Sequence, residues 1–271
     1  MKKIGFIGCG NMGGALVEAV AKFLPGNEIA VCDFDSKKTQ YYEKTVGATV
    51  LSAVDVAKYC NFIVLGVKPQ VCQQAILEIK PFLNSQTTVI SMMAGVSTNA
   101  IQQLFGCNVP VIRIMPNTPA KLGAGMILYT LNNVEESVEK EFLELFQYAG
   151  VLDALPEDKI DAGSALSGCG PAFVYAFAEA LADAGVECGL PRDKALLYAS
   201  QTLLGASEML LKYGHPADLK DAVCSPGGTT IAGIHALERN GFRGATMDAV
   251  LSAYKRTLEL KNKTLPLINA R

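Results

Sequence analysis

Two glycine-rich segments near opposite ends of the chain contain the residue types that bind charged ligands. The first, Gly8–Gly13, has the spacing Gly-x-Gly-x-x-Gly and lies between an apolar run and a helical pattern. In that context the first glycine permits a tight turn, the second lets the backbone approach a pyrophosphate, and the third allows close helix–strand packing. A simple glycine-rich turn is the alternative. We expect dinucleotide binding by Ile7, Gly8, Cys9, Gly10, Asn11, Met12 and Gly13.

The second segment, Ser225–Thr230, reads Ser-Pro-Gly-Gly-Thr-Thr and stands directly before a helical pattern. Backbone N–H groups at a helix N-terminus can bind an anion, and threonine hydroxyls add further donors. A small carboxylate would therefore fit there. An ordinary helix cap after a turn explains the same residues, because serine, threonine and glycine are common at that position. The six residues taken alone favour the cap.

An acidic residue, Asp33, ends the second apolar run. A carboxylate at that place can bind the hydroxyls of the adenosine ribose and disfavours a 2′-phosphate. Ser36, Lys37 and Lys38 follow it and could serve a phosphate, or simply begin a solvated helix. Asp33 therefore favours NADH as the cofactor, and the two lysines leave NADPH as the alternative.

Further segments follow predicted strands and so lie at the carboxyl edge of a sheet, where open α/β sheets bind ligands. Lys68 could act as a catalytic acid, but a structural or cofactor-facing role fits better, since the sequence does not show it buried. Asn117 could hydrogen-bond the substrate or the nicotinamide amide, or belong to a plain turn. The expected cofactor-lining residues here are Gly66, Val67, Lys68, Pro69, Met92, Met93 and Ala94.

The elements that must position these segments follow from hydrophobic periodicity. Through the first half, short apolar runs alternate with amphipathic stretches, which predicts βαβ units and a parallel sheet with helices on both faces. The amphipathic stretches include Ala15–Phe23, Gln70–Ile79 and Asn99–Phe105. The expected strands are Lys3–Gly8, Glu28–Asp33, Ala48–Leu51, Phe62–Val67, Thr87–Met92, Val109–Met115, Gly125–Leu131 and Gly150–Leu155.

After Pro156 the pattern becomes helical. The alanine-rich stretch Ala172–Ala184 is apolar nearly all round, which indicates a subunit interface or a core helix. Further helices are expected from Pro191 to Gly214 and over Ala217–Val223, Thr230–Arg239 and Ala245–Lys263. We therefore expect an α/β fold, with a Rossmann-type dinucleotide-binding domain over residues 1–158 and an all-helical domain over residues 159–271. The boundary should fall between residues 154 and 162.

Composition limits the class of protein. Half of the 271 residues are hydrophobic, 18% are charged and the formal net charge is -2, which predicts a sizeable core and favours neither nucleic acid nor an anionic membrane as a partner. Eight scattered cysteines and only two histidines favour packed, reduced thiols over disulfides or a metal site. The N-terminal apolar run is short for a signal peptide, and no uninterrupted apolar stretch is long enough to span a bilayer. We expect a soluble, cytoplasmic protein.

A series of segments resembles the Δ1-pyrroline-5-carboxylate reductases, which catalyse the last step of proline biosynthesis. The resemblance covers residues 3 to about 263, and RIMPNTPA and SPGGTT are far more specific than the glycine motif. The segments are Ile4–Gly13, Val67–Pro69, Ser91–Val96, Arg113–Ala120, Ser167–Phe173, Asp221–Thr230 and Gly241–Arg243.

The resemblance implies hydride transfer from C4 of NADPH or NADH to the imine carbon of pyrroline-5-carboxylate, which gives L-proline. It also implies a helical domain that interlocks with a second subunit into a homodimer, with larger assemblies of dimers common. An iminium already accepts hydride well, so catalysis should consist mostly of orientation. The Thr230 hydroxyl would face the imine nitrogen as the catalytic group. The resemblance implies that Gly228, Thr229 and Thr230 hold the carboxylate, and we expect Ser225, Gly227 and Asn117 to complete the substrate site.

Two positions depart from the family pattern. Members that prefer NADPH usually have a small hydroxylated or basic residue where Asp33 stands, and Cys169 replaces a common serine. A β-hydroxyacid-dehydrogenase-like oxidoreductase shares the two-domain plan but needs an acid–base lysine, which Gly168–Val174 lacks. A deazaflavin-dependent NADP reductase would leave SPGGTT unexplained. A non-catalytic dinucleotide sensor would bind the cofactor without turnover.

Overall fold

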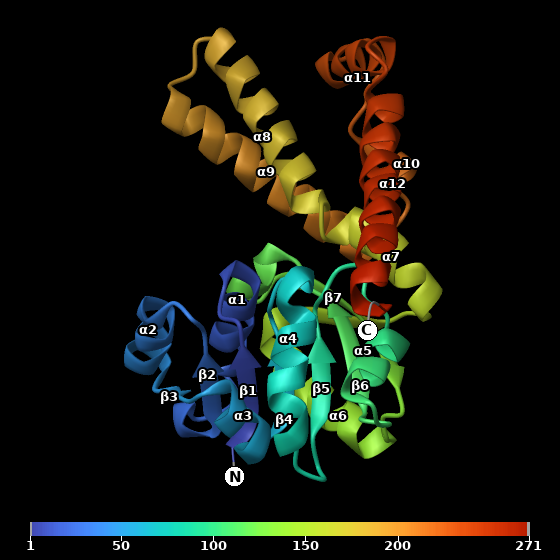
Figure 1. Ribbon diagram of the computed structural model, residues 1–271. Helices are drawn as coiled ribbons and strands as arrows, with labels where there is room; N and C mark the ends of the chain where they lie inside the picture. The colour runs from blue at the N-terminus through green and yellow to red at the C-terminus, as the bar shows by residue number, and fades with distance from the viewer. Residues whose placement is uncertain (1, 270–271) are drawn as a thin grey trace. The chain divides into compact units, whose positions relative to one another are not determined.

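The chain folds into two compact units (Figure 1). The computed structural model describes residues 2–269, without the side chains of Pro69, Gln70 and residues 263–269. Residues up to Cys169, together with those from Ala253 onward, form the first unit, and Gly170–Ser252 forms the second.

The first unit is built on an eight-stranded sheet with the order β3-β2-β1-β4-β5-β6-β7-β8. The first six strands are parallel, as predicted, whereas β7 is antiparallel to β6 and β8 is parallel to β7. The predicted parallel sheet is therefore confirmed for β1 to β6, and the direction of β7 relative to β6 is the exception. The strands are β1 (Lys2–Ile7), β2 (Ile29–Cys32), β3 (Thr49–Val50), β4 (Cys60–Leu65), β5 (Thr88–Ser91), β6 (Val111–Met115), β7 (Gly125–Asn132) and β8 (Gly150–Ala154).

The reversal at β7 has a simple cause in the length of the preceding connection. A parallel crossover needs about a dozen residues or more, usually with a helix. Only Pro116 to Ala124 separate β6 from β7, and they hold the short 3₁₀ helix η3 (Thr118–Leu122). The chain therefore turns back beside β6 instead of crossing the sheet.

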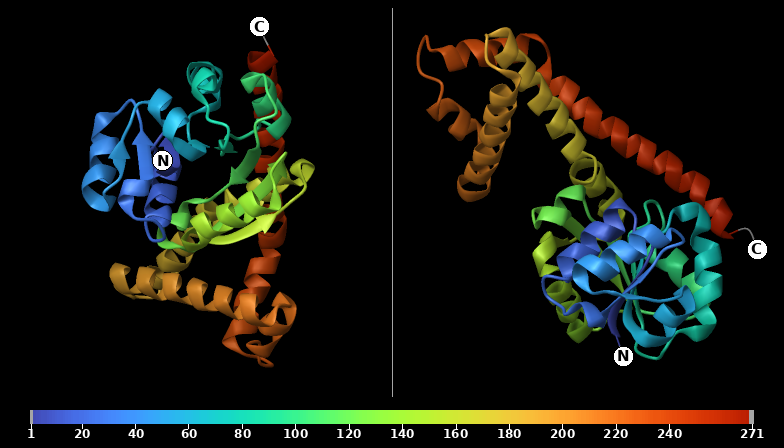
Figure 2. Two further views of the ribbon diagram at one scale, coloured as in Figure 1. Left: turned by 90° about the horizontal axis from the view of Figure 1, so that it is seen from below. Right: turned by 90° about the vertical axis from the view of Figure 1, so that its left-hand side faces the viewer.

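Helices cover both faces of the sheet, as predicted (Figure 2). On one face Leu16, Tyr42 and Phe142 join one buried cluster, and on the other Ile76 and Ile101 join a second. The first cluster belongs to α1 (Asn11–Val20), α2 (Ser36–Val46) and α6 (Glu136–Phe146), the second to α3 (Ala53–Tyr59), α4 (Pro69–Ile79) and α5 (Thr98–Phe105). Short 3₁₀ turns complete the unit at η1 (Gly26–Glu28), η2 (Lys80–Phe82) and η4 (Gln147–Ala149).

Beyond Pro156, the first unit contains one whole helix and the part of another that starts at Ala253. The helix α7 (Glu157–Ser167) packs on the sheet, where its Ile160 is buried with Met115 and Leu128. For this reason the compact units divide at Gly170, later than the division at residues 158 and 159 expected from the sequence. The functional domain limits stay a prediction.

The second unit is wholly helical and exposes much of its apolar surface. Small residues bring α8 and α9 together through Ala182, Ala195 and Ala199. Of the residues of α8, all of which the structure describes, only Ala182 is buried, so this helix is not a core helix of the single chain. The unit contains α8 (Gly170–Glu187), α9 (Arg192–Tyr213), α10 (Pro216–Ala222), α11 (Thr229–Arg239) and the start of α12 (Phe242–Asn269).

A helical stretch over Glu157–Glu187 is long and apolar enough to cross a membrane by length and composition, although acidic residues interrupt it at Glu179 and Asp183. Only 11% of its most apolar window is buried in the chain. Exposed apolar surface of this extent is typical of an interaction face. The alternative of a subunit interface for Ala172–Ala184 therefore remains.

Candidate active site

The glycine motif forms a tight link between β1 and α1. Gly8 has a φ of 99°, and a Cβ there would lie 2.7 Å from the carbonyl carbon of Gly66. A Cβ on Gly13 would lie 2.2 Å from the carbonyl oxygen of Gly8. Both positions therefore require glycine, the first for its turn and the third for close helix–strand packing.

The middle glycine of the motif borders open space. A Cβ on Gly10 would meet no atom within 4 Å. Gly10 is also the N-cap of α1, and among the described residues no side chain caps that helix. Its first N–H groups are thus available to an anion, so the site fits the pyrophosphate of a dinucleotide. A pocket of about 390 Å³ opens here, lined by Cys9, Gly10, Asn11, Ala15, Glu18, Lys38, Tyr42, Thr118 and Lys121.

Asp33 points into the protein. Its Oδ2 accepts a hydrogen bond from the Cys9 N–H at 2.7 Å, and its Oδ1 accepts one from the Asp35 N–H at 2.9 Å. The Lys38 ammonium lies 3.6 Å from Oδ1, and the Asp33 side chain is 3% exposed. These contacts join the glycine loop to the turn between β2 and α2. The predicted ribose contact stays a prediction, and this geometry does not favour it.

The ends of β4 and β5 meet the glycine loop. A Cβ on Gly66 would lie 2.4 Å from the carbonyl oxygen of Gly8 and 2.8 Å from Cε of Met92. The structure therefore brings these predicted cofactor segments to one edge of the sheet. Lys68 and Ala94 are exposed there, and Val67 is half-buried. Met93 is buried, so its predicted cofactor contact stays a prediction, and the Pro69 side chain lies outside the described residues.

Asn117 has both ends of its amide occupied within the first unit. Its Nδ2 donates to the Ser167 carbonyl at 3.0 Å, and its Oδ1 accepts from the Met126 N–H at 2.9 Å. The side chain is buried. The geometry favours a structural role that ties η3 to β7 and α7, and the substrate role stays a prediction.

The Ser-Pro-Gly-Gly-Thr-Thr segment turns sharply into α11. The Gly228 N–H donates to the Ser225 carbonyl at 3.0 Å, Gly227 has a φ of 68°, and a Cβ on Gly228 would lie 2.4 Å from Ser225 Oγ. The helix begins at Thr229 with Gly228 as N-cap, and within the described part of the chain no side chain caps it. Thr229 and Thr230 are exposed. A cap by a serine or threonine side chain is therefore absent there, and the N–H groups can take a carboxylate.

A buried ionic cluster was missed by the sequence reasoning. Arg113 Nη2 lies 2.6 Å from Asp161 Oδ1, and Lys261 Nζ lies 2.9 Å from Asp161 Oδ2. Glu157 accepts from the Thr98 N–H and hydroxyl and lies 3.5 Å from Arg113. Burial works to raise the pKa of Asp161, but the Lys261 hydrogen bond and the Arg113 charge outweigh it and lower that pKa. The sequence signal is an arginine within the apolar strand segment Val111–Met115, because such a charge requires acidic partners when the strand is buried, although the pattern does not say which ones.

The ionic cluster lies next to a predicted cofactor loop. A Cβ on Gly95, directly after Ala94, would lie 3.0 Å from the Cα of Lys261. The last part of α12 is therefore packed against the loop that follows β5. Arg113 and Asp161 are buried beside this loop, whereas Glu157 and Lys261 are partly exposed.

Three of the cysteines, Cys9, Cys60 and Cys72, are buried as the sequence led us to expect, whereas Cys107 and Cys188 are exposed. All eight are free, and burial raises the pKa of Cys9, Cys60 and Cys72 to about 12. A thiol with so high a pKa is a poor nucleophile, because the thiolate is the reactive form. Among the described residues there is no group of three or more side chains that could hold a metal ion.

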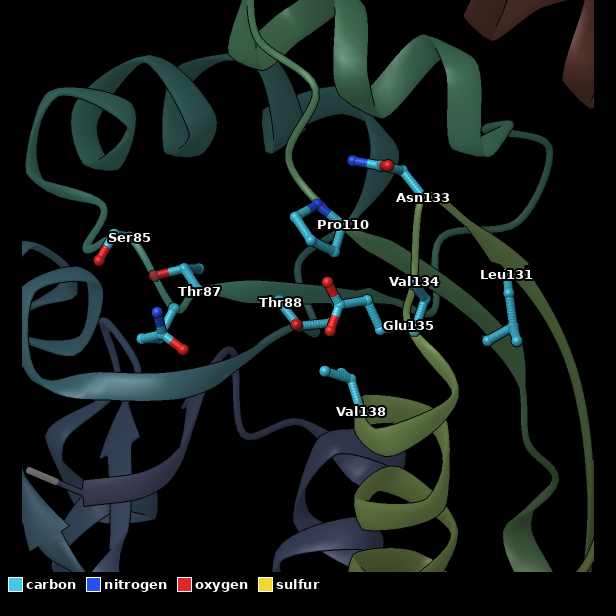
Figure 3. A pocket seen from close by; sticks show the side chains of 10 residues that line it. Ser85, Thr87, Thr88, Pro110, Leu131, Asn133, Val134, Glu135 and Val138 are labelled. Atoms are coloured by element: carbon cyan, nitrogen blue, oxygen red, sulfur yellow. The ribbon is translucent and has the colours of Figure 1, made fainter.

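A second pocket, of about 480 Å³, lies at the other edge of the sheet. Figure 3 shows Thr88, Pro110 and Val134 around it, at the start of β5 and before α6. In open α/β sheets ligands bind outside the carboxyl ends of the parallel strands. By its position this pocket is separate from the glycine-loop site.

Comparison with known proteins identifies the family. Residues 157–260 match the model of pyrroline-5-carboxylate reductase dimerisation, and residues 3–95 match that of NADP oxidoreductase coenzyme F420-dependent. The pyrroline-5-carboxylate reductase of Pisum sativum is 41% identical over 95% of both chains, and that of Escherichia coli is 38% identical over 96% of this chain and 98% of its own.

A solved structure agrees with these relatives. The Plasmodium falciparum pyrroline carboxylate reductase with NADP bound is 33% identical and has a TM-score of 0.85, covering 94% of this chain and 97% of its own. The match extends through both compact units. The chain therefore belongs to the pyrroline-5-carboxylate reductase family.

Proposed function

We propose that this chain reduces Δ1-pyrroline-5-carboxylate to L-proline with NADPH or NADH. The observation that carries the proposal is the full-length relation to pyrroline-5-carboxylate reductases. The reaction moves a hydride, with its electron pair, to the imine carbon, and the ring nitrogen keeps the proton of the iminium. The products are proline and the oxidised nicotinamide.

The glycine-loop edge of the first unit is the proposed cofactor site. A reduced nicotinamide supplies the hydride when it is bound. The uncapped N-terminus of α1 would hold the pyrophosphate, with Gly10 open to it. Gly66 and Met92 contact each other next to Gly8, and they would line the site beneath the dinucleotide.

The start of α11 is the proposed carboxylate site. The N–H groups that follow Gly228 are uncapped among the described residues, and two exposed threonines follow them. A carboxylate would accept from these donors at the positive end of the helix. The Thr230 hydroxyl would hydrogen-bond the imine nitrogen. Its role is to orient the ring, which suits a reaction with little acid–base work.

The chain is a homo-oligomer in this proposal, and we propose a homodimer built through the second unit. The dimerisation match begins in α7 and includes the exposed apolar helix α8. Assemblies of such dimers and a cytoplasmic location belong to the same proposal. No nucleic acid or membrane partner is proposed.

The alternatives account for less of the chain. The F420-dependent NADP oxidoreductase match ends at residue 95 and so covers only the nucleotide-binding part. A β-hydroxyacid dehydrogenase would need an acid–base lysine at the start of α8, where Gly170, Pro171 and Ala172 stand. A non-catalytic dinucleotide sensor would differ from the proposed enzyme only in the absence of turnover.

The test is oxidation of NADPH and of NADH by the purified oligomer, with pyrroline-5-carboxylate as substrate. Substrate-dependent loss of the nicotinamide absorbance is expected with at least one cofactor. A folded protein that binds a dinucleotide but turns over with neither cofactor would support the sensor. Turnover of β-hydroxyacids in place of the imine would support the dehydrogenase.

A further inference from the structure

The turn after β2 presents an unusually exposed aromatic ring. Phe34 is 99% exposed, and among the described residues no large apolar side chain is more exposed. It directly follows Asp33, whose carboxylate is bonded to the Cys9 N–H of the glycine loop. The buried hydrogen bond of Asp33 therefore fixes the position of the ring next to the glycine loop, while the ring itself remains open to solvent.

The position of the ring matches the adenosine end of a bound dinucleotide. When the pyrophosphate lies on the N-terminus of the first helix, the adenosine ribose lies at the carboxyl end of the second strand. That strand is β2, which ends at Cys32. The adenine ring attached to that ribose would then lie next to the turn that contains Phe34. Aromatic side chains can stack on nucleotide bases, because every base has a π-face.

Lys38 places a cation at the same point. Its Nζ lies 5.5 Å from the centroid of the Phe34 ring and 3.6 Å from Asp33 Oδ1. Its side chain also lines the pocket beside Gly10 and is 38% exposed. The ammonium thus faces the nucleotide cradle, within reach of a group on the adenosine ribose.

The carboxylate of Asp33 points away from the place expected for the adenosine ribose. Both of its oxygens accept hydrogen bonds from backbone N–H groups, and the side chain is almost fully buried. Ribose hydroxyls would find no exposed oxygen there. The charge that would repel a 2′-phosphate is also compensated by two N–H dipoles and by Lys38.

We propose that Phe34 stacks on the adenine ring and that Lys38 pairs with the 2′-phosphate, so that the chain binds NADPH more tightly than NADH. This inference rests on the proposed function for the identity of the dinucleotide. It reverses the preference for NADH suggested by the presence of Asp33 in the sequence. Asp33 is a positioning residue that fixes the turn and holds Lys38 over the ring.

Direct binding tests this inference without turnover. Dissociation constants are measured by calorimetry for NADPH and NADH, and for 2′,5′-ADP and 5′-AMP as probes without nicotinamide. Phe34→Ala, Phe34→Tyr and Lys38→Ala are compared with the parent protein. Phe82 and Lys58 form a matched control, because that lysine also lies over an exposed phenylalanine ring, at 5.0 Å.

Phe34→Ala should weaken the binding of NADPH and of NADH by the same factor, between about fivefold and a hundredfold, since each complex loses one base–aromatic stack. Phe34→Tyr should retain affinity. Lys38→Ala should weaken NADPH and 2′,5′-ADP about fivefold, as for one exposed ion pair, and leave NADH and 5′-AMP unchanged. Phe82→Ala and Lys58→Ala should change none of the four constants.

Unchanged affinities in Phe34→Ala, or an equal loss of NADPH and NADH in Lys38→Ala, would overturn the inference. Tighter binding of NADH than of NADPH by the parent protein would overturn it as well. The outcome is separable from that of the proposed function. A protein that shows these binding changes but does not reduce the imine retains the adenosine site and loses the enzymatic assignment.

Discussion

Replacing Asp161 by asparagine should remove more stability than any surface charge on the same helix. Asp161 lies between two cations, with Arg113 at 2.6 Å and Lys261 at 2.9 Å. The side chains of Arg113 and Asp161 are 1% and 5% exposed. Asparagine keeps the size of the side chain and removes its charge, which leaves the Arg113 guanidinium with the Glu157 carboxylate at 3.5 Å as its nearest anion.

The expected loss follows from this geometry. Removing one partner of a buried ion pair costs about 3–5 kcal/mol, because the other charge stays buried and unpaired. Glu157 still compensates Arg113 in part, so the lower end, about 3 kcal/mol, is expected for Asp161→Asn. Asp158→Asn is the matched control on α7. Its pair with Lys159 is well exposed, so a loss below about 1 kcal/mol is expected.

The stabilisation by Asp161 should depend on pH. Burial opposes the charged form, but the Lys261 hydrogen bond and the Arg113 charge outweigh it, and the pKa of Asp161 is lowered in the folded protein. Stability from a carboxyl with a lowered folded-state pKa is fully present above the unfolded value of about 4 and is lost as pH falls through the folded value. The difference between parent and Asp161→Asn should therefore shrink below about pH 4.

Urea unfolding followed by far-UV circular dichroism measures these losses, since the chain has no tryptophan. Parent, Asp161→Asn and Asp158→Asn are compared at one protomer concentration, because oligomerisation contributes to apparent stability. Equal losses in the two variants at neutral pH would refute the reasoning. A loss in Asp161→Asn that stays constant down to acid pH would refute its electrostatic part.

Other substitutions test the two halves of the site. Gly10→Val should leave the unfolding midpoint unchanged, because the added side chain meets no protein atom near its Cβ, and should weaken dinucleotide binding more than tenfold in calorimetry. Thr230→Ala should lower kcat far more than it changes dinucleotide affinity, and unchanged kinetics would remove Thr230 from the site. Asn117→Ala should cost about 1–3 kcal/mol in urea unfolding, since it leaves the Met126 N–H and the Ser167 carbonyl unpaired. A large loss of substrate affinity in Asn117→Ala without a stability loss would restore its predicted substrate role.

Local pattern was enough to predict how the strand ends converge. Gly8 and Gly66 follow apolar strands, and parallel strands with crossover helices must end at the same edge of a sheet. The structure confirms that these segments meet, with Met92 closing the contact. The reversal of β7 was missed although the short Pro116–Ala124 connection was readable. The alternation of strands and helices does not indicate the direction of a strand when the connection before it is too short to cross over the sheet.

Side-chain direction and long-range charge pairing were beyond the sequence. Asp33 lies at the place where a ribose acceptor stands, yet the Cys9 N–H, which only the folded loop brings near, turns its carboxylate inward. The cluster of Arg113, Asp161 and Lys261 joins residues that no local pattern relates. For α8, an all-apolar helix predicts burial but does not say whether the same chain or a second subunit provides it.

The most direct test of the central claim is the fate of a labelled hydride. Pyrroline-5-carboxylate is incubated with the protein and a nicotinamide cofactor deuterated at C4, and the product is examined by mass spectrometry and by its chirality. L-proline carrying one deuterium at the former imine carbon, formed in step with cofactor oxidation, is the predicted result. Dinucleotide binding without any labelled proline, with either cofactor, would contradict the assignment of this chain as a pyrroline-5-carboxylate reductase.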